Sequence, residues 1–197
     1  MRSGLYLAPG FSLCNIQAPA ANQALFFGES FALSSLTVAV AFPSLEFLQV
    51  LQREVAAERE RFSRLGFFDT TFGVRVVQDG GPAEFTVAFE VFDCIRVVDG
   101  IEPGVDFVIE GPLAAWKDML DNIHELGAAD TAHSLNTLTH FGERLQVRYD
   151  DPDGHDKLYR FAESVQEWLD LSSRADFRYP DGTTPPTRRD VSRRVAT

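Results

Sequence analysis

The sequence predicts an α+β fold, in which five strands form a sheet and helices cover it. Three observations predict this class. A capped amphipathic helix begins near Ser44, two β-rich runs joined by a Gly-Gly turn follow it, and a later strand continues through Gly111-Pro112 into a helix that carries Trp116. The chain has 197 residues, 45% of them apolar, which is enough to bury the core of one domain. We place that domain at residues 44–171.

The first predicted helix extends over about five turns. Ser44 is a good N-cap residue, and Gly66 can take the left-handed conformation that ends a helix. The apolar residues between them recur at helical spacing: Leu48, Leu51, Val55, Phe62 and Leu65. The opposite face carries a run of Glu and Arg residues, which we interpret as a solvated surface.

Five stretches have the pattern of strands. Residues 70–78 and 84–92 predict a hairpin, because aromatic and β-branched residues alternate there with smaller or polar ones. Residues 94–98, 105–109 and 143–149 supply the other three strands. Both faces of the hairpin carry apolar residues, so both sides of the sheet could be covered.

Three more helical segments complete the domain. The helix after Pro112 places Trp116 and Met119 on one apolar stripe. A short segment that contains Leu135 precedes the fifth strand. The last helix, at about residues 156–171, has a single apolar stripe that includes Trp168.

The two ends of the chain differ from this domain in composition. Residues 1–43 are rich in Ala, Pro, Gly and Ser and are interpreted as an irregular arm. An alternating stretch at residues 36–42 could form a strand that extends the main sheet or pairs with a second copy of the chain. Residues 172–197 are rich in Pro and Arg and contain almost nothing that could pack, which predicts a disordered tail. This basic tail could contact an anionic membrane or an acidic partner transiently, or serve only as a solubilising tail.

Composition argues against several classes of protein. A formal net charge of −11 disfavours nucleic acid as a partner, because phosphate backbones are bound through basic surfaces. Cys14 and Cys94 lack metal-ligand spacing, so neither a disulfide framework nor a metal site is predicted. No apolar run approaches the roughly 20 residues of a membrane-spanning helix. Pro, Gly and polar residues interrupt the N-terminus, which argues against a secretory signal. We expect a cytoplasmic protein without a cofactor.

The order of the elements resembles the sterol carrier protein family, type two, over residues 44–171. The most specific matches are residues 105–120, a strand followed by a Trp-bearing helix, and residues 141–147, a Gly-led strand before the last helix. The resemblance implies a twisted five-stranded sheet with helices on one side and an apolar tunnel between them for an acyl chain, a sterol or a polyketide-like molecule. Two features depart from the family. Residues 121–124 replace the Gly that usually follows the Trp-bearing helix, and the turn at residues 150–156 is longer, so ligand specificity is not transferable.

The tunnel that this resemblance implies would be lined by large apolar side chains. We predict that a hydrophobic ligand contacts seven of them: Phe72, Val87, Phe89, Trp116, Met119, Leu120 and Trp168. The alternative is that these residues fill an ordinary core, because aromatic and Met residues at strand or helix spacing are usually buried. The 17 Phe residues suit a filled core as well as a cavity wall.

An enzyme that acts on a hydrophobic substrate is the second hypothesis. The sequence lacks the motifs of common hydrolases, kinases, zinc peptidases and dehydrogenases. The weak catalytic candidates are Asp121, His124 and His140, which at the mouth of the tunnel could transfer protons in a cyclase or isomerase reaction. A third hypothesis is an accessory dimerisation module, in which the N-terminal arm contributes the contact of a homodimer.

Overall fold

The computed structural model describes residues 39–140 and 144–187. The chain divides into two units, Met1–Leu36 and Thr37–Thr197, and every described residue belongs to the second unit. Most of the predicted arm and the end of the predicted tail therefore lie outside the described residues.

A mixed five-stranded sheet forms the centre of the second unit, in the order β4-β3-β2-β5-β6. Its strands are β2 (Thr70–Val77), β3 (Ala83–Glu90), β4 (Asp93–Asp99), β5 (Phe107–Pro112) and β6 (Gln146–Arg148). β2 and β5 run parallel, and the other neighbouring pairs are antiparallel. The predicted α+β class with a five-stranded sheet is confirmed.

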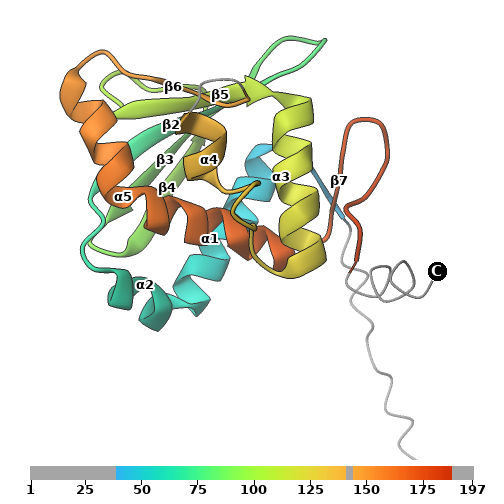
Figure 1. Ribbon diagram of the computed structural model, residues 1–197, viewed down its shortest axis with the longest axis horizontal. Coiled ribbons are helices and arrows are strands. Elements are labelled where there is room, and N and C mark those ends of the chain that lie inside the picture. The colour runs from blue at the N-terminus through green and yellow to red at the C-terminus, as the bar shows by residue number, and fades with distance from the viewer. Residues whose placement is uncertain (1–38, 141–143, 188–197) are drawn as a thin grey trace, which may run out of the picture. The chain divides into compact units, whose positions relative to one another are not determined.

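Helices cover one face of this sheet, which we call the inner face (Figure 1). They are α1 (Leu45–Ala57), α2 (Arg59–Leu65), α3 (Leu113–Leu126), α4 (Leu135–His140) and α5 (Pro152–Asp170). α1, α3 and α5 contribute buried side chains to one apolar cluster with the inner face, and α2 and α4 contact α5. The core of the domain therefore lies between the sheet and these helices.

The C-terminal segment, residues 171–187, packs on the domain in its first half. The 3-10 helix η1 (Leu171–Arg174) continues from α5, and β7 (Phe177–Arg178) pairs in parallel with β1 (Val40–Ala41). Four apolar side chains in this first half are buried: Leu171, Ala175, Phe177 and Tyr179. The prediction that almost nothing beyond residue 171 packs was wrong here, because the alternating Ala175, Phe177 and Tyr179 form too short a run to stand out in a stretch rich in Pro and Arg. A strand does form in this stretch, but the expectation that it extends the main sheet was wrong, since β1 pairs with β7. Pairing with a second copy of the chain stays a prediction.

The first predicted helix is divided at Glu58. Ser44 caps α1 as expected, because its hydroxyl accepts a hydrogen bond from the backbone N–H of Phe47 (3.1 Å). At Glu58 the backbone leaves helical geometry (φ −106°, ψ 26°), and α2 begins at the next residue. Arg174 of the C-terminal segment pairs with Glu54 (3.5 Å) and Glu58 (2.7 Å). The continuous helix was therefore a wrong prediction, because the backbone departs from helical geometry at Glu58. The interpretation of the charged face as solvated also fails for Glu54 and Glu58, which pair with Arg174.

α3 begins directly after β5 and is longer than its resemblance to the family implied. It ends at Gly127, which adopts the left-handed conformation (φ 92°) and donates its backbone N–H to the carbonyl of Ile123 (2.7 Å). A glycine therefore does follow the Trp-bearing helix. The expectation that residues 121–124 replace it was wrong, because the helix continues through these residues.

The connection from β4 to β5, which we call the crossover segment, passes over the outer face of the sheet. β4 is an edge strand, and β3 and β2 separate it from β5. The hydroxyl of Thr86 on β3 donates to the carbonyl of Gly100 (2.8 Å) and accepts from the N–H of Glu102 (2.9 Å). Gly73 on β2 makes room for Ile101, because a Cβ at Gly73 would lie 2.7 Å from Ile101 Cδ1. Both sides of the sheet are therefore covered along this crossing.

Candidate functional site

The seven side chains predicted to contact a ligand lie together in the core. We call them the interior layer: Phe72, Val87 and Phe89 from the sheet, Trp116, Met119 and Leu120 from α3, and Trp168 from α5. Each is at most 4% exposed. Phe72 stacks on Phe107 with ring centroids 5.3 Å apart, and Trp168 stands edge to face on Phe72 at 5.5 Å. Contact of this layer with a ligand stays a prediction.

The interior layer contains two hydrogen-bond donors without partners. Nε1 of Trp116 and Nε1 of Trp168 are both buried and make no hydrogen bond. An unpaired donor in an apolar interior is unfavourable by about 1–3 kcal/mol. Sequence reasoning named both residues, but no sequence signal shows that their N–H groups lack acceptors.

The core has little polar character otherwise. In the described part of the chain, the buried polar residues are Thr70, Thr86, Thr139, Ser164, Asp170 and Ser172. No Lys, Arg or His is among them. The interior of the described domain therefore offers no buried counter-charge to an anionic group.

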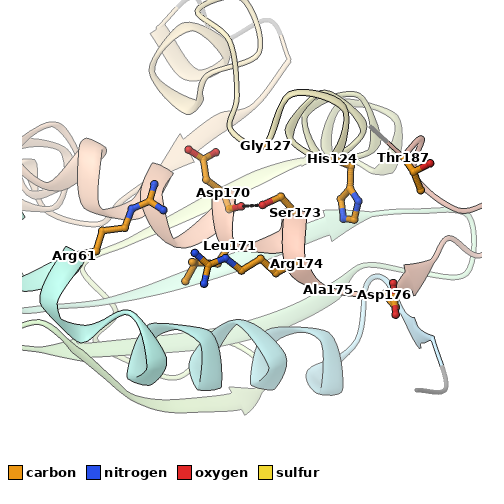
Figure 2. A pocket seen from close by; sticks show the side chains of 10 residues that line it. All are labelled: Arg61, His124, Gly127, Asp170, Leu171, Ser173, Arg174, Ala175, Asp176 and Thr187. Carbon is orange, nitrogen blue, oxygen red and sulfur yellow. Dashed lines mark hydrogen bonds between the residues drawn. The ribbon is translucent and has the colours of Figure 1, made fainter. Parts of the chain in front are cut away.

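A cavity of about 450 Å³ adjoins the end of α3 (Figure 2). Its lining comes from α2, α3, the end of α5 and the C-terminal segment, and we call it the His124 cavity. A neighbouring cavity of about 270 Å³ shares four lining residues with it: His124, Ala175, Asp176 and Thr187. The interior layer lines neither cavity. The open space at this end of α3 is therefore separate from the residues predicted to bind a ligand.

The charged groups of the His124 cavity are largely engaged. The two guanidinium groups form ion pairs, Arg61 with Glu167 of α5 and Arg174 with Glu58 at the bend. Asp170 accepts hydrogen bonds from the backbone N–H of Ala129 (3.1 Å) and from the side chain of Gln166 (2.8 Å). Burial raises the pKa of the Asp170 carboxyl group. The cavity thus presents charges of both signs that already have partners.

His124 stands in this cavity as a half-buried imidazole. Burial lowers its pKa, and a hydrogen bond with the Ser172 backbone and the charges of Asp121 and Asp176 oppose this effect. Nε2 is buried and has no hydrogen-bond partner. The ring lies edge to face against Phe177 at 5.0 Å. The geometry favours the neutral ring, which can take up a proton.

The other two catalytic candidates do not assemble with His124. Asp121 accepts a hydrogen bond from the hydroxyl of Tyr179 (2.8 Å) and pairs with Lys117 (3.4 Å). It therefore ties α3 to the C-terminal segment. His140 lines a different cavity of about 410 Å³. The charge of Asp121 acts on the pKa of His124, but neither Asp121 nor His140 lines the His124 cavity.

Sequence reasoning missed most of the His124 cavity. Arg174, Asp176 and Thr187 belong to the stretch that was predicted to be disordered, and Arg61 belongs to a helix face interpreted as solvated. The aromatic residues Phe177 and Tyr179 were the one sequence signal that this stretch could pack.

Three further properties follow from the described residues alone. Within residues 39–140 and 144–187, no group of three His, Cys, Asp or Glu side chains is placed to hold a metal ion. No helix in that same part of the chain is long and apolar enough to cross a membrane. Burial raises the pKa of Cys94 to about 12, so this thiol stays protonated at neutral pH.

Comparison with known proteins identifies the fold. No family model matches the sequence, and no curated protein matches it. The crystal structure of sterol carrier protein 2 matches with a TM-score of 0.51 and 18% identity, covering 66% of this chain and 95% of that chain. The described domain therefore has the sterol carrier protein 2 fold, and the fold implied by the resemblance is confirmed.

Two solution structures are similar at lower TM-scores. One is a conserved hypothetical protein from Thermus thermophilus, described as a possible sterol carrier protein, at a TM-score of 0.48 and 18% identity over 68% of this chain and 89% of that chain. The other is palmitated SCP2L2 from Aedes aegypti, at a TM-score of 0.41 and 18% identity over 62% of this chain and 94% of that chain.

Proposed function

We propose that this protein binds or carries a hydrophobic small molecule, such as a fatty acyl chain, a sterol or a polyketide-like compound, within the interior layer. The observation that carries the proposal is this layer, an apolar set of side chains between the sheet and α3 and α5 in a domain with the sterol carrier protein 2 fold. The similar crystal structure is that of a protein named as a sterol carrier, which supports a ligand of this class.

Burial of apolar surface would supply the affinity. At about 25 cal/mol per Å², a ligand that hides roughly 300 Å² gains on the order of 7 kcal/mol before ordering costs. That gain is enough for capture near micromolar concentration without a charged anchor. The absence of a buried cation from the described core fits such a ligand.

The interior layer must open to accept a ligand, because the two cavities at the end of α3 lie outside it. Met119 suits this change, since its unbranched side chain has several rotatable bonds and is fully buried in the layer. Binding is therefore expected to reorganise the core side chains while the sheet stays intact.

Native mass spectrometry of freshly purified protein tests the proposal, followed by titration with fluorescent fatty acids and sterols. The two Trp residues of the chain both belong to the interior layer, so ligand entry should change the intrinsic Trp emission. If no lipid co-purifies and no probe changes the emission, the carrier function is excluded.

Acid–base catalysis on a hydrophobic substrate is the second candidate, and the His124 cavity is the observation that favours it. The cavity is lined by His124, whose pKa is lowered by burial, and by Asp170, whose carboxyl pKa is raised by burial. Replacing His124 by Ala should abolish any measured turnover, whereas replacing His140 should not, because it lines another cavity. Full turnover in the His124→Ala protein would exclude this role.

The third candidate, a dimerisation module, concerns residues 1–43, most of which lie outside the described residues. We propose to delete them and to compare the mass in solution with that of the full chain. An unchanged oligomeric state would argue against a role for the arm in assembly.

We also propose a cytoplasmic location for this protein, which cell fractionation can test.

A further inference from the structure

We infer that the molecule bound in the interior layer is a neutral lipid with an oxygen acceptor, such as a ketone or an ester, in preference to a plain hydrocarbon or an ionised fatty acid. This inference rests on the proposed function and names the ligand class for the same site.

The unpartnered indole groups are the first observation. Trp116 is 1% exposed and Trp168 is 0% exposed, and neither Nε1 has a hydrogen-bond partner. The indole N–H can only donate, so a complementary ligand must bring an acceptor. A hydrocarbon would leave both donors unpaired in an apolar surrounding, whereas a carbonyl or ether oxygen would satisfy one of them.

The surroundings of Trp168 offer no strong acceptor. Its ring stands edge to face on Phe72 (interplanar angle 81°) and on Phe89 (85°). An aromatic face is a much weaker acceptor than an oxygen atom. Because these aromatic neighbours supply only weak acceptors, an oxygen atom of the ligand would be a better partner for the N–H group of Trp168.

The absence of a buried positive charge is the second observation. No Lys, Arg or His is buried within residues 39–140 and 144–187. Arg75, Arg61 and Arg174 lie outside the core and form ion pairs with carboxylates of the protein. A carboxylate drawn into the layer would lose its hydration without gaining a counter-charge. The interior layer therefore selects against ionised acids.

A matched series of probes tests this selectivity. Octadecane, octadecan-2-one and stearate share a chain of similar length and differ in the polar end. Each is supplied from cyclodextrin and competes with a fluorescent lipid for the full-length protein at slightly alkaline pH. We expect the ketone to bind roughly 2- to 10-fold more tightly than the alkane for each donor that it satisfies, and stearate to bind more weakly than the ketone.

Three variants assign the preference to the indole groups. Trp116→Phe, Trp168→Phe and the double variant remove the donors and retain aromatic rings, and the double variant should bind ketone and alkane with equal affinity. Phe47→Leu is the matched control, because Phe47 is a buried core residue outside the interior layer and its replacement removes no N–H group. It should keep the ratio between ketone and alkane.

Nuclear magnetic resonance of the wild-type protein provides a second readout that needs no variant. The chain has two Trp residues and hence two indole N–H resonances. Addition of the ketone should move at least one of them downfield, as a new hydrogen bond does, and addition of the alkane should not. This measurement decides the question even if a Trp variant fails to fold.

The outcomes separate the inference from the proposed function. Equal affinity for alkane and ketone, unmoved indole resonances, or tightest binding of stearate would overturn the inference and leave hydrophobic binding intact. If the fluorescent lipid itself does not bind and none of the probes binds, the carrier function itself is rejected.

Discussion

The two faces of the central sheet are covered in different ways. The inner face carries Phe72, Phe89 and Phe107 and packs against helices that were recognisable from their apolar stripes. The outer face carries a polar set, in which Arg75 bridges Glu84 (2.6 Å) and Glu110 (2.7 Å), and it is crossed by a segment without regular structure. Burial of apolar area holds the helices on the inner face, whereas a few directional hydrogen bonds and ion pairs stabilise the outer face.

This difference indicates which face of the sheet could accommodate an apolar ligand. Apolar packing is non-directional, so the inner face can exchange one apolar partner for another at modest cost. The hydrogen bonds that Thr86 makes with the crossover segment have fixed geometry and have no such substitute. We therefore expect plasticity in the interior layer and rigidity on the outer face, and three substitutions test this contrast.

Phe72→Ala should have the largest effect. Phe72 is 0% exposed and contacts the rings of Phe89, Phe107 and Trp168. Loss of the side chain leaves a cavity, so the free energy of unfolding should fall by about 3–5 kcal/mol, as measured by urea denaturation. Phe67→Ala is the matched control, because Phe67 is 75% exposed and its loss should change stability by no more than about 0.5 kcal/mol. Equal losses in the two variants would contradict the assignment of Phe72 to the core.

Thr86→Val should have an intermediate effect on the outer face. Val has nearly the same shape as Thr, but it leaves the Gly100 carbonyl and the Glu102 N–H without their partner. The free energy of unfolding should fall by about 1–3 kcal/mol. Hydrogen exchange at the Glu102 amide should accelerate, and Thr86→Ser, which keeps the hydroxyl, should retain most of the protection. If Thr86→Val exchanges like the wild type, the crossover segment is held by other contacts.

The sequence predicted the inner face well because its causes are local. Alternation placed Phe72 and Phe89 on one face, and helical spacing placed Trp116 and Trp168 on apolar stripes, so the members of the interior layer could be named in advance. Both signals depend on residues close together in the chain.

The outer face and the His124 cavity could not be predicted in this way. The path of the crossover segment follows from β5 pairing with β2, which is a long-range choice. The bend at Glu58 involves Arg174, and the cavity depends on the packing of Phe177 against His124. These contacts join segments with no sequence period in common, and the Arg- and Pro-rich composition concealed the C-terminal partner.

Glu110→Gln should have the smallest effect of the three substitutions on the free energy of unfolding, and this effect should depend on pH. The hydrogen bond from Arg75, with further support from Arg148, holds the pKa of Glu110 below its ordinary value of 4.5. Because the pKa is lowered in the folded state, the stabilisation is complete above that ordinary value and is lost as the pH falls through the folded-state pKa. At neutral pH the variant should lose at most about 1 kcal/mol, since the network is partly exposed.

The measurement compares the free energy of unfolding of wild type and Glu110→Gln across the acid range. The difference between them should shrink as the pH falls, because protonation removes the charge in the wild type that the substitution has already removed. Glu90→Gln, at an exposed position of β3, is the matched control and should track the wild type at every pH. A difference that stays constant with pH would show that Glu110 stabilises the outer face by packing. The claim that ion pairs stabilise the outer face would then be wrong.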